Sequence, residues 1–442
     1  MLSTVGGKLV ATVPIASPCH DTFPGVGFDA GLCAQIQADW ARPELHDRTA
    51  HSPMAAFFAN LNCDPFTPRH AQCVLGTYVP YAVNASGASD YRETIAFDKK
   101  HNIRLVICNT SHDYMGKSTG PGLGGPGSSG CEGLAVVEGD CPTVSIAGSY
   151  TQGGGTSSLG SKFGLAADRV LEWEVITGKG ELLTTTPRQN SDLYWALAGG
   201  GGGTYGVVLS MTVKLHSNMP TAGATLSFTE SSDAYWDIVQ AFLLNLPEVL
   251  DTGATLYWLV LPGDMLLMPQ SYFPGGTSQD LERLLQPALQ ALDKIFASTA
   301  FQDAYHGSNP EMNITELNLG GRLIPRSLVA SDSSVASLTG AIKSIISKGG
   351  ILAGVSMDIS RPPTSSNAVH QGWCEALFLA VLGTVYDRYD MTANIMGQQT
   401  VTKVLVPTLE DITPGGAAYL NEAEFNQPNW QRVFYGTGYP RL

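Results

Sequence analysis

The amino-acid sequence predicts an α+β protein made of two unequal parts. Residues 78–108 read as a strand, a helix and a second strand, and residues 170–185 alternate as a β-hairpin does around a turn at 178–180. After residue 216, amphipathic helices alternate with apolar runs of strand length, which is typical of a mainly antiparallel sheet covered by helices. A chain of 442 residues is long enough to divide in this way.

Residues 1–70 show no strong periodicity apart from a short helix expected at 28–40. A strand at 78–83, a helix at 89–101 that stops at Asn102, and a strand at 103–108 would form a β-α-β unit. In such a unit, ligands bind at the carboxyl ends of the strands. We therefore expect a ligand near the loop that follows residue 108.

Short strands are expected at 135–137 and 143–147, before the hairpin. A helix over 191–198, capped by Asn190 or Ser191, and a strand over 207–215 complete the first part. The glycine- and proline-rich run at 120–130 excludes both helix and strand. In the second part, helices are expected at 233–246, 278–296, 334–348 and 391–405, and strands at 254–261, 322–324 and 351–359.

Composition narrows the possible functions. Acidic residues outnumber basic ones by 39 to 25, and the formal net charge is −14. A negatively charged protein is poorly suited to a phosphate backbone, so we expect no nucleic-acid partner. No run of 18 apolar residues occurs, so we expect no membrane span. We expect a monomer that acts on a small molecule.

The cysteines show no CxxC pair and no metal-ligand spacing. Four of the eight lie in the first 73 residues, where disulfides would staple a loop-rich segment, with the pairing left open: Cys19, Cys33, Cys63 and Cys73. Glycosylation acceptor patterns begin at Asn84, Asn109 and Asn313. These features favour a secreted glycoprotein whose signal peptide is missing from this sequence.

His112 is the main candidate functional residue, because it lies in the loop that follows the strand expected at 103–108. The preceding Asn109, Thr110 and Ser111 offer amide and hydroxyl donors that can hold an anion. Taken alone, His112 is more simply a loop histidine bonded to nearby backbone. Gly201-x-Gly203-x-x-Gly206 matches a dinucleotide fingerprint formally, but a helix precedes it and a strand follows, which is the reverse of the required order.

Five motifs in order give a more specific signal, with a sixth element near the end of the chain. They are Val106-Ile-Cys-Asn-Thr-Ser-His-Asp-Tyr-Met-Gly-Lys-Ser118, Gly139-Asp-Cys-Pro-Thr-Val144, Tyr150-Thr-Gln-Gly-Gly-Gly155, Lys162-Phe-Gly-Leu-Ala-Ala-Asp168, Trp195-Ala-Leu-Ala-Gly-Gly-Gly201 with Thr204-Tyr-Gly-Val-Val208, and Tyr419-Leu-Asn421. Residues 71–216 resemble the PCMH-type FAD-binding domain of the vanillyl-alcohol oxidase superfamily. The whole chain resembles the berberine-bridge-enzyme-like branch, in particular its fungal members.

The resemblance implies four segments: an extension with the start of the FAD domain at 1–70, the FAD-binding domain at 71–216, a substrate domain at 217–415, and a return to the FAD domain at 416–442. It also implies bicovalent FAD, joined through His112 to the 8α-methyl group and through Cys141 to C6. Further cofactor contacts would come from Asn109, Thr110, Ser111, Asp113, Gly116, Gly139, Val144, Gly148, Gly153, Gly154, Gly206, Val207 and Asn421. The backbone at Gly153 and Gly154 would approach the cofactor where a Cβ would clash.

The implied reaction is an oxidation. A base takes a proton from the substrate, a hydride passes to the flavin, and dioxygen accepts the electrons to give hydrogen peroxide. The substrate would be an alcohol, a carbohydrate or a secondary metabolite. Tyr419 is our candidate base, with a pKa lowered beside the flavin. Arg322 and Arg326 would orient an anionic substrate group or pair with acids.

Aromatic residues of the second part would line the substrate pocket or belong to the ordinary core: Tyr257, Trp258, Tyr272, Trp373 and Tyr386.

Departures from the family pattern support a second hypothesis. Ser111 replaces a glycine, which requires a negative φ there. His112 and Cys141 are only 29 residues apart (141 − 112), where relatives insert a longer segment, and the chain is expected to be shortened at both ends. The alternative is therefore a family member that no longer binds FAD productively and is not catalytic.

Overall fold

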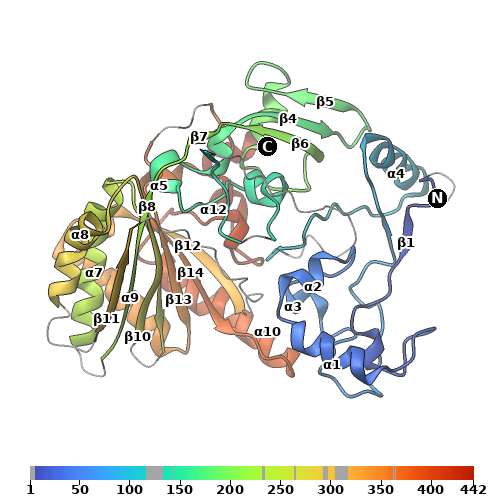
Figure 1. The fold of residues 1–442 in the computed structure, drawn as a ribbon, viewed down its shortest axis with the longest axis horizontal. Coiled ribbons are helices and arrows are strands. Elements are labelled where there is room, and N and C mark those ends of the chain that lie inside the picture. Colours follow the sequence, from blue (N-terminus) through green and yellow to red (C-terminus); the bar gives the residue numbers. More distant parts are fainter. Residues whose placement is uncertain are drawn as a thin grey trace.

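The computed structural model describes residues 5–115, 133–141, 143–230, 234–262, 265–291, 297–303, 317–361, 363 and 365–442. A helix-covered sheet forms one side of the molecule, and the N-terminal segments form the other (Figure 1). The last segment, which carries α12 (Trp430–Tyr435), lies between them. No helix in these ranges is both long and apolar enough to span a bilayer.

The second part is organised around a seven-stranded sheet of order β11-β8-β10-β9-β13-β14-β12, in which every neighbouring pair is antiparallel. Its strands are β8 (Thr221–Thr229), β9 (Thr255–Leu261), β10 (Met265–Pro274), β11 (Ala297–Gln302), β12 (Leu317–Pro325), β13 (Ile351–Ser356) and β14 (Ala376–Val385). The antiparallel sheet that the sequence predicts is confirmed, although β8, β10, β11 and β14 were not expected.

Three helices cover one face of this sheet: α7 (Ala234–Asp251), α8 (Ser278–Ala291) and α9 (Asp332–Ser347). Each lies where an amphipathic pattern predicts it. The start of α9 is set by Ser331, whose hydroxyl accepts a hydrogen bond from the Ser334 N–H. Farther on, α10 (Met391–Thr400) continues through a π-helical turn into α11 (Val406–Glu410), so the helix expected at 391–405 is present and longer.

The sheet is buried on both faces. Successive side chains of a strand point to opposite sides, and in β12 Ile324 joins the core beneath the helices whereas Leu323 packs on the other side. That other side also holds Trp373 and Tyr419. The return segment that carries Tyr419 is therefore anchored on the face of the sheet opposite the helices.

The first part has short strands in small sheets. A three-stranded sheet of order β5-β4-β6 consists of β4 (Val170–Ile176), β5 (Leu182–Thr185) and β6 (Val207–Val213), and the predicted hairpin is confirmed. A second pair joins β3 (Leu134–Ala135) to β7 (His216–Ser217). The helices are α1 (Ala30–Asp39), α2 (Pro43–Asp47), α3 (Ala56–Ala59), α4 (Ala88–His101), α5 (Gly160–Phe163) and α6 (Ser191–Leu197).

The expected β-α-β unit is wrong. Helix α4 ends where Asn102 takes a left-handed conformation (φ 52°), as predicted, but β2 (Tyr81–Val83) pairs antiparallel with β1 (Leu9–Ala11). Residues 103–108 form no strand within the described ranges. Their alternation is that of a strand, yet Ile103 is 49% and Leu105 41% exposed, because no neighbouring strand covers them or completes a hydrogen-bond ladder. An alternating sequence therefore does not form a strand unless a neighbouring strand pairs with it.

The strand expected at 143–147 is also wrong, because a π-helical turn occupies Ile146–Tyr150. The strand at 135–137 is reduced to β3, one residue earlier.

Disulfides do staple the N-terminal segment. Cys19 pairs with Cys33, and Cys63 pairs with Cys73. Both bonds lie among short helices and loops that have only a small apolar core of their own.

Candidate functional site

Two adjoining cavities meet at His112: one lies within the first part of the chain, and the other lies between the first part, the seven-stranded sheet and the return segment. The polar cavity, of about 280 Å³, is lined mainly by residues 104–107, the loop 109–113 and the turns 144–150 and 202–204. The tyrosine cavity, of about 260 Å³, is lined by the loops 112–115 and 139–141, Tyr257 of β9 and the return segment 419–422. Both are bordered by His112, Asp113, Val144, Ser149, Tyr150 and Gly202, so together they form one continuous site.

His112 and Cys141 meet in the wall of the tyrosine cavity. The His112 Nε2 atom lies 2.7 Å from the Thr143 hydroxyl and 4.0 Å from the Cys141 sulfur. A β-bridge to Met54 fixes the backbone of His112. Burial lowers the pKa of His112 to about 4, so its imidazole is neutral at neutral pH and a ring nitrogen keeps its lone pair. His112 and Cys141 therefore place two nucleophilic side chains 4.0 Å apart in the wall of the same cavity.

The loop before His112 faces the polar cavity and is strained at Ser111. We expected a negative φ at this residue, but it is +67°, in the region that favours glycine. The Ser111 hydroxyl lies 2.6 Å from the Cys108 sulfur, so the chain forms a tight turn between these two residues. A non-glycine residue in this conformation costs about 1 kcal/mol. The negative-φ expectation is wrong because the turn requires the left-handed conformation whatever residue occupies it.

Only some of the expected glycines border the cavities. Gly139 lines the tyrosine cavity and Gly148 the polar cavity. By contrast, a Cβ at Gly153 would collide with Asn421, and one at Gly154 would touch Tyr419 at 3.3 Å. These two glycines therefore admit the return segment, and in the structure they contact neither cavity.

Gly206 and Val207 belong to the packing of β6, because a Cβ at Gly206 would strike Val175 and Ile176 of β4. Val207 joins the small core around Ile95, away from both cavities. Gly116 lies outside the described residues.

Tyr419, our candidate base, is held firmly by hydrogen bonds to its hydroxyl group. Its hydroxyl oxygen accepts hydrogen bonds from the Gly155 N–H (3.0 Å), the Thr156 N–H (3.3 Å) and the Asn421 side-chain amide (2.9 Å). The same amide donates to the Tyr150 carbonyl at 3.0 Å. Burial raises the pKa of Tyr419, opposite to the direction we expected. Tyr419 and Asn421 pin the return segment to the loop at 150–156.

Two carboxyl groups that we did not predict border the tyrosine cavity. Burial raises the pKa of Asp140, which accepts hydrogen bonds from Tyr257 and Ser158. Burial and the nearby Asp140 raise the pKa of Glu422 to about 7. Asp140 directly precedes Cys141, and Glu422 directly follows Asn421. Their position next to these motif residues is the only feature of the sequence that could have identified them as site residues.

Comparison with known proteins places the chain. It is 40% identical to the FAD-linked oxidoreductase sor8 of Hypocrea jecorina, over 99% of this chain and 83% of the relative. It is 37% identical to the VAO-type flavoprotein oxidase VAO615 of Thermothelomyces thermophilus, over 99% of this chain and 86% of the relative. This chain belongs to the VAO-type FAD-linked oxidoreductases.

Solved structures agree with this assignment. The VAO-type flavoprotein MtVAO615 of Myceliophthora thermophila superposes with a TM-score of 0.90 at 34% identity, covering 100% of this chain and 90% of that one. BBE-like 1 of Physcomitrella patens shares the fold alone, with a TM-score of 0.69 at 15% identity over 82% of this chain and 87% of that one. No family model matches the sequence. The alignment with sor8 spans 489 positions, so at least 47 of them (489 − 442) are gaps in this oxidoreductase.

The residues of this FAD-linked oxidoreductase fit the cofactor. The Asn109 side-chain oxygen is buried beside the polar cavity, and no described residue bonds it, which suits a group that contacts a bound molecule. Gly202 and Gly203 line the same cavity with backbone atoms alone. Asn109 to Asp113 would hold the diphosphate side of FAD, and His112 and Cys141 would face its flavin.

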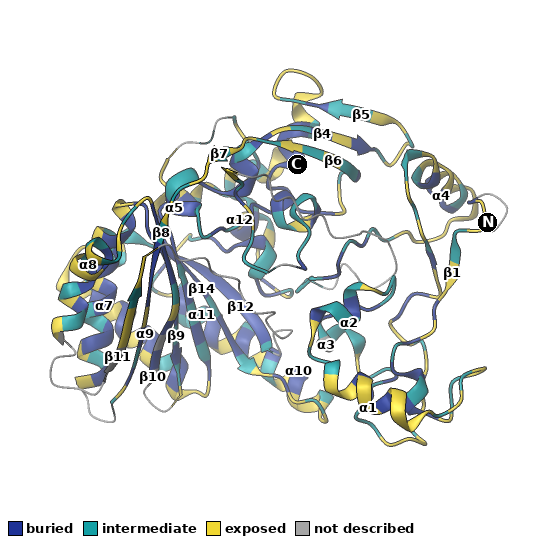
Figure 2. Cartoon of the chain, in the orientation of Figure 1, coloured by how far each residue is buried: buried dark blue, intermediate teal, exposed yellow. Residues whose placement is uncertain are grey.

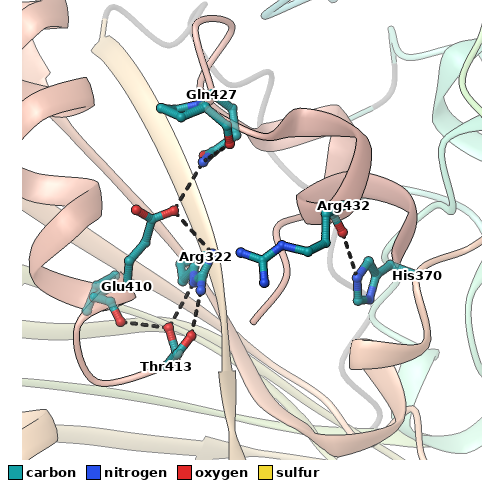
Figure 3. A network of polar contacts seen from close by, with 8 residues as sticks. Arg322, His370, Glu410, Thr413, Gln427 and Arg432 are labelled. Carbon is teal, nitrogen blue, oxygen red and sulfur yellow. Dashed lines mark hydrogen bonds and ion pairs between the residues drawn. The ribbon is translucent and has the colours of Figure 1, made fainter. Parts of the chain in front are cut away.

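Arg322 and Arg326 lie away from the cavities. Buried Arg322 donates to the Thr413 hydroxyl (2.8 Å) and carbonyl (2.6 Å) and lies 3.4 Å from Glu410, which also accepts from Gln427 (Figure 3). Arg326 pairs with Asp251 and Asp358, which is the alternative we left open for it.

Of the five aromatic candidates, Tyr257 alone borders the tyrosine cavity. Trp258 and Trp373 are buried in the ordinary core.

Proposed function

We propose that this oxidoreductase is an oxidase that removes a hydride from a neutral alcohol, carbohydrate or secondary metabolite. FAD, when bound, supplies the redox chemistry, because it accepts the hydride and returns the electrons to dioxygen as hydrogen peroxide. The protein binds and orients the substrate, excludes water and removes a proton. The meeting of His112 and Cys141 at the wall of the tyrosine cavity is the observation that carries this proposal.

Covalent attachment through both residues is part of the proposal. The neutral imidazole of His112 is a competent nucleophile, and the Thr143 hydroxyl, 2.7 Å from its Nε2 atom, orients the ring. Cys141 lies 3.4 Å from the same hydroxyl. Two bonds to one flavin would fix its ring between the loop at 109–113 and the loop at 139–141.

The charge of the tyrosine cavity supports a neutral substrate. Asp113, Asp140 and Glu422 border it, and none of its described lining residues is a lysine or arginine. An anionic substrate would meet like charges with no partner, which is unfavourable. Tyr114, Tyr150 and Tyr257 add aromatic surface and hydroxyl groups suited to a hydroxylated or aromatic compound.

We also propose that the protein is secreted. Two disulfides in the N-terminal segment are typical of an oxidising compartment.

The second candidate function is a relative that holds no flavin productively. It is favoured by residues 103–108, which form no strand among the described residues and leave Ile103 and Leu105 exposed, and by the 47 or more alignment gaps. A colourless protein after purification with excess FAD would support this candidate over the oxidase.

The test of the oxidase uses the full chain and two matched probes, benzyl alcohol and para-carboxybenzyl alcohol. Hydrogen peroxide is measured under air, and bleaching of the flavin absorbance is measured without oxygen. We expect the neutral alcohols, including sugars tested alongside, to be oxidised at least ten times faster than the carboxylate. Equal rates would contradict the substrate charge, and bleaching without peroxide would contradict dioxygen as the acceptor.

A further inference from the structure

Three side-chain oxygen groups border the tyrosine cavity from the side of the return segment and its neighbours, and they differ in what they already bind. The Tyr419 hydroxyl accepts three hydrogen bonds. The Asp140 carboxylate accepts from Tyr257 and Ser158. The Glu422 carboxyl has no hydrogen-bond partner among the described residues, although it borders the same cavity. Glu422 is therefore the group whose oxygens are available to a bound molecule.

The backbone that carries Glu422 is fixed. Its N–H donates to the Tyr419 carbonyl at 3.1 Å in the short 3-10 helix Leu420–Glu422, and Tyr419 is anchored by the contacts described above. Its carbonyl lies so close to Gly321 of β12 that a Cβ there would collide with it. A side chain held on such a turn keeps its direction, which a proton acceptor requires.

We propose that Glu422 is the proton acceptor for the hydroxyl group of the substrate. This inference rests on the proposed function and deepens it. The O–H bond of the alcohol breaks and its proton moves to the Glu422 carboxylate, while the C–H bond breaks and its electron pair leaves as hydride to the oxidised flavin. The carbon and oxygen then share a double bond, so the alcohol is oxidised by two electrons to a carbonyl compound and the flavin is reduced by two.

The electrostatics agree with that geometry. A general base works best when its pKa lies near the working pH, and burial with the nearby Asp140 raises the pKa of Glu422 to about 7. Burial raises the pKa of Asp140 as well, and the hydrogen bonds from Tyr257 and Ser158 oppose that shift and fix its carboxyl group beside Glu422. The titratable groups that border the cavity with Glu422 are His112, Asp113, Tyr114, Asp140, Cys141, Tyr150, Tyr257 and Tyr419.

The first test measures the carboxyl group without substrate. Difference infrared spectra of the full chain should show a protonated-carboxyl C=O band that disappears as the pH rises through about 7. We expect Glu422→Gln to lack this band. Asp140→Asn should move its disappearance to lower pH, because removing the neighbouring negative charge lowers the pKa of Glu422. Glu375→Gln is the matched control, because Glu375 is exposed and does not line the tyrosine cavity; this variant should keep the band unchanged.

The second test measures hydride transfer from benzyl alcohol to the flavin without oxygen. Loss of a general base typically slows a reaction by about 100-fold or more, so Glu422→Gln should be slowed at least that much and lose the rise in rate between pH 6 and 8. The variant should match the wild type in flavin content, in the amount of flavin that stays with the acid-precipitated protein, and in melting temperature. Those three readouts separate a lost base from a damaged site.

The outcomes are distinct. Persistence of the carboxyl band in Glu422→Gln, or reduction of its flavin at the wild-type rate, would overturn the assignment to Glu422 and leave the oxidase proposal standing. A wild-type flavin that neither benzyl alcohol nor a sugar reduces would overturn the proposed function and the role of Glu422 with it.

Discussion

The seven-stranded half of this molecule (residues 217–415) and the half that precedes it (residues 5–216, here called the cofactor half) are stabilised in different ways. In the seven-stranded half, one continuous apolar cluster runs from β8 through α7 and α9 to α11. In the cofactor half, several small clusters are separated by loops, with strands as short as β3. Figure 2 shows the same contrast, with a buried sheet on one side and an exposed α1 on the other.

The contrast shows where the free energy of each half comes from. Burial of apolar surface in one large cluster is the main stabilising contribution in the seven-stranded half. The cofactor half has two disulfides and the contacts of Tyr419 and Asn421, and bound flavin would stabilise it further. Its site is therefore built from the less self-sufficient part of the chain.

The largest effect should come from a cavity in the large core. Phe242 of α7 is 2% exposed and lies against Trp258, so Phe242→Ala should lower the free energy of unfolding by about 3–5 kcal/mol. Leu244→Ala, at a 42% exposed position on the same helix, is the control and should cost less than about 1 kcal/mol. Urea unfolding followed by tryptophan fluorescence measures both. Equal losses in the two variants would show that burial of Phe242 in the large core does not determine the stability of this half.

The next effect should come from the polar cluster that supports the return segment, in which Glu410 accepts a hydrogen bond from Gln427. Arg322 is buried, and Arg322→Met would remove its hydrogen bonds to Thr413 and its ion pair with Glu410, at a cost of about 3 kcal/mol. The return segment 416–442 should then be cleaved faster in limited proteolysis. Arg326→Met removes a more exposed ion pair and should cost about 1 kcal/mol or less. A return segment equally protected in both variants would show that Arg322 does not anchor it.

A disulfide variant should act on the cofactor half alone. Cys63→Ser opens the 63–73 loop and should cost about 2–3 kcal/mol in that half, because a short closed loop restricts the unfolded chain less than a long one. Cys374→Ser, at an exposed free thiol, is the control. Hydrogen exchange should rise in residues 5–80 and stay unchanged in α7. A rise in both halves would mean that they unfold as one unit.

A smaller effect should follow from acid. Burial lowers the pKa of His51 to about 4, below the ordinary value of 6.5. The unfolded chain then takes up a proton below pH 6.5 that the folded chain does not, so stability is lost as the pH falls from 6.5 towards 4. His51→Gln should remove about 2 kcal/mol of the difference between pH 7 and pH 5. Exposed His70→Gln should leave the pH dependence as it is, and a matching loss there would contradict burial as the cause.

Sequence reasoning recovered the elements that carry their own signal. Helices α7 and α9 were expected because their apolar residues recur at helical spacing over several turns. Strand β14, Ala-Leu-Phe-Leu-Ala-Val-Leu-Gly-Thr-Val, was missed because it is apolar on both faces and shows no alternation. Residues 103–108 alternate well but form no strand in the described chain, because strand pairing depends on neighbours that are distant in sequence.

The same limit applies to the site. His112 and Cys141 were predicted from motifs, and the structure brings them within 4.0 Å. Glu422 was missed because its value as an acceptor depends on what Tyr419 and Asp140 already bind, which only the folded chain shows. The φ of Ser111 follows from a turn that closes on Cys108, and residue type does not reveal it.

Acid precipitation tests directly whether His112 and Cys141 hold a flavin. The full chain, purified with FAD and denatured in acid, should carry yellow colour into the protein pellet. His112→Ala and Cys141→Ala should each keep the colour through the remaining bond, and the double variant should release it to the supernatant. A wild-type pellet without colour, or a double variant that stays yellow, would contradict the account.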